Sequence, residues 1–194
     1  METLKVGEGD WLIQTAANGA VGKIMVGLAK ARGVKLLNLL RREGAAEELR
    51  ETGAENVLSI DDADWQSKAR ELIGQEGAVS AIDSVGGELG GQLVELLGKD
   101  GELIVFGTAT GQPLTMSSGE LIMKHITVKG FWGSRVSSEM PPETRVRLIG
   151  ELVQLAAKGQ LPLDTGGIYP LAEVTEAMNA ALTTGRGGKV MLRP

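Results

Sequence analysis

Apolar residues in this chain occur in short runs, and stretches with the periodicity of a helix separate these runs over the first two thirds of the sequence. In one such stretch Ile24, Met25, Leu28 and Ala29 recur at the three- and four-residue spacing that places side chains on one helix face. The pattern predicts helices at 19–32, 45–53, 65–73, 90–98 and 119–125. The apolar runs between them predict strands at 10–16, 34–40, 56–60, 78–85, 101–107 and 126–132.

Most of these predicted strands are apolar on both faces, which is what a parallel sheet covered by helices on both sides requires. The alternation therefore predicts an α/β fold, with a doubly wound (Rossmann) parallel sheet of about six strands, over residues 1–140. From Pro141 the rhythm changes. Two helices at 141–159 and 171–185 and a last strand at 187–194 predict a C-terminal helical arm that occupies residues 141–194.

Composition and charge narrow the classes of partner. The chain has 194 residues, of which 42% are hydrophobic, and it is long enough to bury a core. A formal net charge of -5 without a long basic run argues against nucleic acid, because binding a phosphate backbone requires a surface rich in Lys and Arg. No segment is apolar enough for a membrane span, and the first residues contain no apolar signal-peptide core, so we expect no membrane partner.

Cysteine and histidine usage bears on metal chemistry and on the cellular compartment. The absence of cysteine excludes disulfides, thiol catalysis and thiolate metal sites, and it fits a cytoplasmic protein. With His125 as its single histidine, the chain would need carboxylates for most ligands of a zinc site, which is rare for that metal. We therefore expect no metal site and a cytoplasmic location.

The residues from Ala17 to Gly22 form an A-x-G-x-x-G sequence between the first predicted strand and the first predicted helix. This is a form of the dinucleotide-binding fingerprint, and a strand–helix–strand unit is the context that the fingerprint requires. Gly19 would let the backbone approach a pyrophosphate, and Gly22 would let the helix pack on the strand. The alternative is a tight turn that binds nothing. Asp83, which ends the fourth predicted strand near the expected crevice, is expected to cap a neighbouring helix or turn.

The second predicted strand is followed by Arg41 and Arg42, at the place where a site for NAD would carry an acidic residue. A guanidinium can bind a phosphate group through two parallel hydrogen bonds, so this pair favours the 2′-phosphate of NADP. The alternative is that both arginines are solvated surface residues. The sequence therefore predicts NADP as the cofactor and leaves open which arginine contacts it.

Several short segments carry a resemblance to a known family, and they occur in that family's order. They read AANGAVG, NLLRR, AIDSVGG, GELIVFG, VKGFWGS and GGKVMLRP. On these segments the chain resembles the zinc-independent branch of the medium-chain dehydrogenases/reductases, which includes the quinone oxidoreductases and the mitochondrial-type 2-enoyl thioester reductases. The resemblance extends over essentially the whole chain, and its GFW block is more similar to the enoyl reductases.

The resemblance implies a set of cofactor-binding residues. In the family these residues form a pyrophosphate loop, adenosine-phosphate contacts, a loop beside the nicotinamide ribose, a segment that closes over the nicotinamide, and a late lysine near the cofactor. In that order the matching residues are Asn18, Gly19, Ala20 and Val21, then Arg41 and Arg42, then Phe106, Gly107, Thr108 and Ala109, then Phe131, Trp132 and Gly133, and finally Lys189. Without the resemblance, the two aromatic residues would equally well be core or interface residues.

Members of this family also have an N-terminal catalytic barrel domain, to which no segment of this sequence corresponds. The enoyl reductases keep their proton-donating tyrosine in that domain, and Tyr169 matches no such position. The resemblance therefore implies no catalytic residue in this chain. In full-length relatives the arm returns to the catalytic domain, so we expect the face with Met178, Ala181 and Leu182 to be partly exposed and the strand KVML to be an unpaired edge.

The hypothesis that combines these observations is the NADPH-binding domain of an oxidoreductase. In an intact parent, hydride would pass to an enoyl thioester or to a quinone-like acceptor. The resemblance also implies a homodimer through the sixth predicted strand, and an open apolar edge strand favours such pairing. One alternative is a non-catalytic module that binds a nucleotide or a partner protein. A methyltransferase-like fold is a weaker alternative, because a ribose-binding acid would be expected in place of the two arginines.

Overall fold

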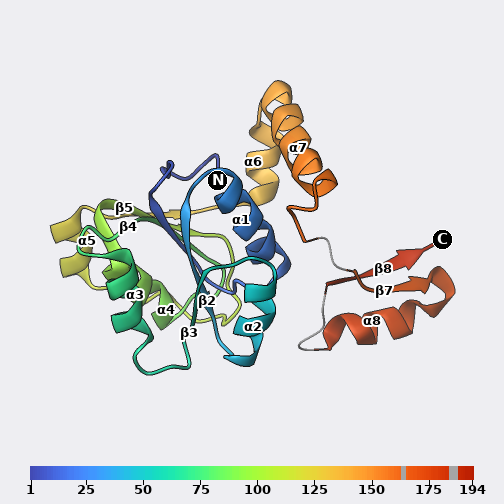
Figure 1. Ribbon diagram of the computed structural model, residues 1–194, viewed down its shortest axis with the longest axis horizontal. Coiled ribbons are helices and arrows are strands. Elements are labelled where there is room, and N and C mark those ends of the chain that lie inside the picture. The colour runs from blue at the N-terminus through green and yellow to red at the C-terminus, as the bar shows by residue number, and fades with distance from the viewer. Residues whose placement is uncertain (163–164, 184–187) are drawn as a thin grey trace.

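The computed structural model describes residues 1–162, 165–183 and 188–194. Its main feature is a six-stranded parallel sheet with the strand order β3-β2-β1-β4-β5-β6 (Figure 1). The strands of this sheet are β1 (Trp11–Gln14), β2 (Lys35–Leu40), β3 (Asn56–Ser59), β4 (Ala78–Asp83), β5 (Leu97–Val105) and β6 (Thr127–Gly130). The doubly wound α/β fold expected from the sequence is thus confirmed.

Helices connect consecutive strands of the sheet and cover both of its faces. One face carries α1 and α2, and the other carries α3, α4 and α5 (Figure 1). Their bounds are α1 (Ala20–Ala31), α2 (Gly44–Glu51), α3 (Trp65–Ile73), α4 (Glu88–Leu96) and α5 (Ser118–Lys124). The helix α3 has the bounds predicted from the sequence. The strand β5 begins at Leu97, before the predicted residue 101, because Leu97 pairs with Ala78 ahead of a shift in register.

The strand order reverses between β1 and β4. The chain first builds outward from β1 through β2 to β3, then returns to the middle of the sheet, where β4 pairs with the other side of β1. Loops that leave the carboxyl ends of β1 and β4 therefore diverge to opposite faces. In doubly wound sheets a crevice forms at this point.

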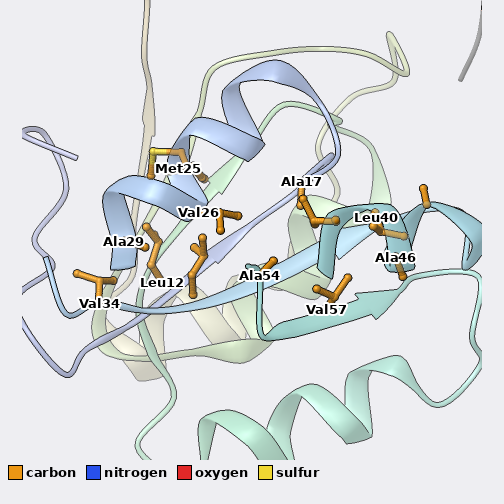
Figure 2. Close-up of a cluster of buried hydrophobic side chains, with 14 of the residues drawn as sticks. Leu12, Ala17, Met25, Val26, Ala29, Val34, Leu40, Ala46, Ala54 and Val57 are labelled. Carbon is orange, nitrogen blue, oxygen red and sulfur yellow. The ribbon is translucent and has the colours of Figure 1, made fainter. Parts of the chain in front are cut away.

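The alternation of side chains along the strands produces two hydrophobic layers. On the α1 and α2 face, Leu12 of β1 packs with Val26 and Ala29 of α1, and Leu40 of β2 lies beside Ala17 and Ala46 in the same cluster (Figure 2). Ile13, which follows Leu12 in β1, and its register partner Leu37 in β2 point to the opposite face. There they pack with α3 and α4. Because adjacent strand residues serve different layers, both must be apolar, which explains the continuous hydrophobic runs in the sequence.

A second, smaller unit follows the main sheet. It consists of β7 (Thr165–Pro170), the 3-10 turn η1 (Leu171–Glu173), α8 (Val174–Leu182) and β8 (Lys189–Arg193). The expectation of an unpaired last strand was wrong, because β8 pairs in parallel with β7. The sequence of β7, TGGIYP, contains two glycines and a proline, which are rare in strands, and so its strand was not predicted. Met178 and Leu182 of α8 are largely exposed, as expected.

Two further helices lie between the main sheet and this unit, α6 (Gly133–Glu139) and α7 (Pro142–Ala157). The segment that follows α7 lies against α1 so closely that a Cβ atom on Gly27 would be 2.4 Å from the carbonyl oxygen of Gln160. Only glycine permits this approach. None of the helices in the described ranges is long and apolar enough to cross a bilayer.

Ion pairs connect α7 with the end of α1 and with the N-terminal segment. Arg32 donates from Nε to Oε1 of Glu151 over 3.1 Å and from Nη2 to Oε2 over 2.7 Å, and it also contacts Glu2 over 3.1 Å. Arg147 donates to the second carboxylate oxygen of Glu2 over 2.6 Å. Two guanidinium groups thus alternate with two carboxylates, and the paired geometry at Arg32 makes this the strongest contact of the network.

This network predicts a specific loss of stability in acid. Donation from Arg147 lowers the pKa of Glu2, and donation from Arg32 lowers the pKa of Glu151. A carboxyl group whose pKa is lowered by folding stabilises the fold above its unfolded pKa, and this contribution is lost as the pH falls through the folded pKa. Between about pH 5 and about pH 3, the urea midpoint should therefore fall more steeply in the unmodified protein than in Arg32→Gln.

The control for this experiment is Arg70→Gln, which removes an exposed ion pair with Glu95 on the opposite face. It should keep the acid dependence of the unmodified protein. If the urea midpoint of Arg32→Gln depends on pH in the same way as that of the unmodified protein, the ion-pair network does not cause the loss of stability in acid.

Candidate functional site

The loop between β1 and α1 is held in one conformation by backbone hydrogen bonds. Ala17 donates its N–H to the carbonyl oxygen of Leu39 over 3.1 Å, which ties the loop to the neighbouring strand β2. Gly19 donates to the carbonyl oxygen of Ala16 over 2.9 Å and closes a tight turn. Ala16 itself has a φ of 49°, in the left-handed region that residues with a side chain rarely adopt. The loop is therefore a defined and locally strained structure.

The two glycines of the fingerprint are required for different reasons. A Cβ atom on Gly22 would lie 2.3 Å from the carbonyl oxygen of Ala17, so this glycine allows α1 to pack directly on the loop. A Cβ atom on Gly19 would meet only the carbonyl oxygen of Ala16, at 3.2 Å, and the φ of -75° at Gly19 suits any residue. The fold thus needs glycine strictly at position 22, whereas at position 19 a side chain would require the Ala16 carbonyl to shift by only a few tenths of an ångström.

The N-terminus of α1 is not capped by any side chain. Its N-cap residue is Gly19, and its first turn contains no acidic residue. The first N–H groups of a helix have no intrahelical acceptor, and they coincide with the positive end of the helix dipole. A phosphate group has the charge and the oxygen atoms that suit such a helix end.

Asp83 organises the opposite side of the crevice, at the end of β4. Its side chain is fully buried and accepts three hydrogen bonds, from the Thr15 hydroxyl over 2.7 Å and from the N–H groups of Val85 and Gly86 over 2.9 Å each. Thr15 Oγ1 also accepts the N–H of Ser84 over 3.0 Å. The expectation that Asp83 caps a turn is confirmed, and the contact with Thr15 joins the loops after β1 and β4.

The loop after β5 is bonded to the same turn. Ala109 and Thr110 donate their N–H groups to the carbonyl oxygens of Ser84 and Val85, over 3.1 and 3.0 Å. Gly107 allows the two loops to come this close, since a Cβ atom there would lie 2.7 Å from the Ser84 carbonyl oxygen. The loops that follow β1, β4 and β5 therefore form one connected rim at the carboxyl end of the sheet.

A groove of about 790 Å³ lies along this rim. Its charged lining residues are Arg41 and Glu88, and the rest are apolar or neutral polar. Of the residues predicted to contact a cofactor, the groove is lined by Asn18, Arg41 and Ala109. Lining residues that the sequence analysis did not single out come from the loop after β1, from the ends of β2 and β3, from α3 and α4, and from the loops after β4 and β5: Ala16, Leu39, Leu40, Ile60, Trp65, Val85, Gly86, Gly87, Glu88, Leu89, Gln92, Thr110, Gln112, Pro113 and Thr115.

The two arginines after β2 differ in position. Arg41 lines the groove, and its backbone is fixed because its carbonyl oxygen accepts a hydrogen bond of 2.7 Å from Ser59. Both arginines are exposed, but Arg42 does not line the groove. Among the residues that the structure describes, no ion pair involves either guanidinium.

The other predicted site residues are not among those that line the groove. Gly19 is the N-cap of α1, and Ala20 and Val21 belong to its first turn. Phe106, Gly107 and Thr108 follow β5, and Phe131, Trp132 and Gly133 follow β6; Trp132 is 71% exposed, whereas Phe131 packs against the core on the α1 face. Lys189 begins β8 in the small sheet and does not line the groove.

Two comparisons with known proteins agree with this architecture. The chain is 30% identical over 162 residues to the mitochondrial enoyl-[acyl-carrier-protein] reductase of Kluyveromyces lactis, and the match covers 78% of this chain and 42% of the relative. A structure from Bacillus thuringiensis assigned as an NADPH:quinone reductase superposes with a TM-score of 0.87 at 24% identity, covering 98% of this chain and 57% of that one.

A third comparison involves an assembly. The mitochondrial 2-enoyl thioester reductase heterodimer of Candida tropicalis matches with a TM-score of 0.80 at 21% identity, over 94% of this chain and 53% of the matched one. At such identities the two structural matches show a shared fold. The chain spans about half the length of the proteins it matches.

Residues 20–149 match a family model described as zinc-binding dehydrogenase. The residues of this chain do not fit a zinc ion: it has no cysteine, and its single histidine, His125, pairs with Asp100 at the end of α5. Within the described ranges, no three His, Cys, Asp or Glu residues are grouped so that they could hold a metal ion. Because the match covers more than half of the sequence, the chain belongs to the zinc-binding dehydrogenase family.

Proposed function

We propose that this chain is the NADPH-binding domain of an oxidoreductase. The observation that carries the proposal is the uncapped N-terminus of α1, which lies beside a groove whose lining includes Asn18 and Arg41. A helix end without a capping side chain leaves N–H groups for a phosphate, and Gly19 lets the backbone approach it. The names of the matched proteins, an NADPH:quinone reductase and two enoyl reductases, support a nicotinamide cofactor.

The residues of the rim fit such a cofactor along its length. The pyrophosphate would lie against the loop from Asn18 to Val21 and the 2′-phosphate against Arg41, with Arg42 contributing charge from outside the groove. The segments Phe106–Ala109 and Phe131–Gly133 would border the nicotinamide end, with Lys189 near the cofactor once the arm is docked. Nicotinamide supplies a hydride when bound, and this chain's residues would hold and orient it.

For the whole protein we propose reduction of an enoyl thioester or a quinone-like acceptor, with the substrate's side of the cleft formed by a further domain. The arm, residues 141–194, would contact that domain. Exposed apolar residues on α8 and β8, among them Met178, Leu182 and Met191, support this, because a contiguous apolar surface favours a protein partner. The same surface also suits the alternative of a non-catalytic module that binds a nucleotide and a partner protein.

The cofactor preference is the first test of the proposal. NADPH should bind about tenfold to a hundredfold more tightly than NADH, because a charged hydrogen bond contributes roughly 1.5–3 kcal/mol. Calorimetric titration with both cofactors measures this ratio. Arg41→Ala should remove most of the preference, and Arg42→Ala, its matched control outside the groove, should remove less. Equal affinities for the two cofactors would contradict the NADP assignment.

A second test separates the two roles of glycine in the loop. Gly19→Val should remain folded, because the backbone at this position suits any residue, but it should abolish NADPH binding by filling the space for the pyrophosphate. Gly22→Val should instead destabilise the fold, since its Cβ would overlap the Ala17 backbone. Thermal unfolding and titration distinguish the two outcomes, and NADPH binding by folded Gly19→Val would show that the loop is only a turn.

We also propose a homodimer through β6. This strand is the edge of the sheet, and all of its residues are exposed. Because Phe131 donates its N–H to Val105, alternation along the strand turns the N–H of Val128 toward the open edge. Val128→Pro removes that donor and should yield monomers in sedimentation velocity, whereas Val128→Ala, which keeps the N–H, should remain dimeric. A monomeric unmodified protein at micromolar concentration would refute the interface.

Turnover is the last test. The chain alone should bind NADPH but reduce neither crotonyl thioester nor a small quinone, because positioning of a substrate can account for roughly 7–11 kcal/mol of a barrier. The single tyrosine, Tyr169, lies on β7 and not in the groove, so it is not placed to donate a proton there. Following NADPH absorbance measures turnover. A rate above about one per second that persists in Trp132→Ala would place an active site elsewhere.

A further inference from the structure

Two buried amide side chains lie side by side beneath the start of α1. Gln14 and Asn38 are register partners on the adjacent strands β1 and β2, and each is 1% exposed. Gln14 donates from Nε2 to Oδ1 of Asn38 over 2.6 Å and to the carbonyl oxygen of Gly22 over 3.1 Å. Asn38 in turn donates to the backbone oxygens of Leu36 and Asn56, over 3.3 and 3.2 Å. A chain of hydrogen bonds thus runs from α1 across three strands.

The position of Gln14 makes it a brace across the phosphate-binding loop, defined here as residues 15–19. Gln14 is the last residue of β1, and Gly22 belongs to the first turn of α1, so one side chain bonds the two ends of the loop to each other. The loop between them includes Ala16 in its left-handed conformation. A strained backbone persists only where its surroundings hold it, and the brace supplies such a constraint.

The cost of this arrangement indicates that it is not required for packing alone. Oε1 of Gln14 is buried and has no hydrogen-bond partner. A buried polar atom without a partner destabilises a protein, whereas an apolar side chain of similar shape could fill the same space without that cost. Departures of this kind from packing rules concentrate at functional sites.

We propose that Gln14 is a positioning residue for the phosphate-binding loop. Through Gly22 it fixes the first turn of α1, and through Asn38 it fixes β2, which ends directly before Arg41. Gln14 thereby sets the spacing between the N–H groups that would hold the pyrophosphate and the guanidinium that would hold the 2′-phosphate. The inference rests on the proposed function, since it concerns the same cofactor, but it adds a residue that would not touch the cofactor.

The test compares two ligands in Gln14→Met, which keeps the length of the side chain and removes the amide. NADPH would contact the loop and Arg41 together, whereas adenosine 2′-monophosphate would contact only the arginine end. The affinity for NADPH should fall about tenfold, which corresponds to the loss of one net hydrogen bond. The affinity for adenosine 2′-monophosphate, measured by saturation-transfer NMR, should stay within about twofold of its original value. Equal losses for both ligands, or no loss for either, would overturn the proposal.

Ser80→Ala is the matched control. Ser80 lies on β4, is fully buried and also has an unpartnered oxygen, but no hydrogen bond connects it with the loop. Its replacement should leave both affinities unchanged. If Ser80→Ala loses as much NADPH affinity as Gln14→Met, then any change in the buried polar atoms of the sheet weakens binding. That result too would overturn the proposal.

Hydrogen exchange gives a readout that does not depend on any ligand. In Gln14→Met the N–H groups of Ala17 and Gly19 should exchange faster, while those of β5 should keep their protection. Asn38→Leu, which removes one acceptor of the brace, should give a smaller change in the same direction and serves as the second variant if Gln14→Met does not fold. If the unmodified protein does not bind NADPH, the proposed function is wrong. Separately, unchanged hydrogen exchange of the loop in Gln14→Met would overturn the role of Gln14.

Discussion

The buried carboxylate of Asp83 is the contact on which the candidate site depends. It lies where the strand order reverses, and it accepts hydrogen bonds from the loop after β1 and from the turn after β4. A buried carboxylate is stable only when its oxygen atoms are fully hydrogen-bonded, so the two loops are held together by the requirement to satisfy Asp83. The loop after β5 then bonds to the same turn through Ala109 and Thr110. One side chain thus supports all three loops of the rim.

Close backbone approach is the second constraint on the site. Gly22 and Gly107 are both positions where a Cβ atom would overlap a neighbouring carbonyl oxygen, at 2.3 and 2.7 Å, so the rim can be this compact only with glycine there. Gly19 is less constrained, because its dihedral angles suit any residue and a Cβ atom would approach only the carbonyl oxygen of Ala16, at 3.2 Å. A residue whose identity the fold explains only in part is a candidate for explanation by a ligand, and the N-terminus of α1 beside it fits an anion.

The two ends of the molecule are stabilised in different ways. In the main sheet the central strands β1, β2 and β4 are buried on both faces, and polar side chains occur there mainly where they join loops. The region after Pro141 relies instead on the ion pairs around Arg32 and on a few contacts with α1, and much of its apolar surface remains exposed. Burial of both sheet faces makes the first part a self-sufficient core, whereas α8 and β8 leave apolar side chains exposed, among them Met178, Leu182 and Met191.

The sequence by itself determined the sheet, its covering helices and the position of the glycine-containing loop between β1 and α1, because these follow from periodicity and from glycine spacing within a few residues. It could not reveal β7, whose sequence TGGIYP becomes a strand only because β8 supplies its hydrogen bonds. Nor could it separate Arg41 from Arg42, since only the packed strand shows which of two neighbours faces the groove. For the same reason the sequence did not predict that the groove is lined by Trp65, Gln92 and Thr115. These residues are far apart in the chain, and only tertiary packing brings them to one surface.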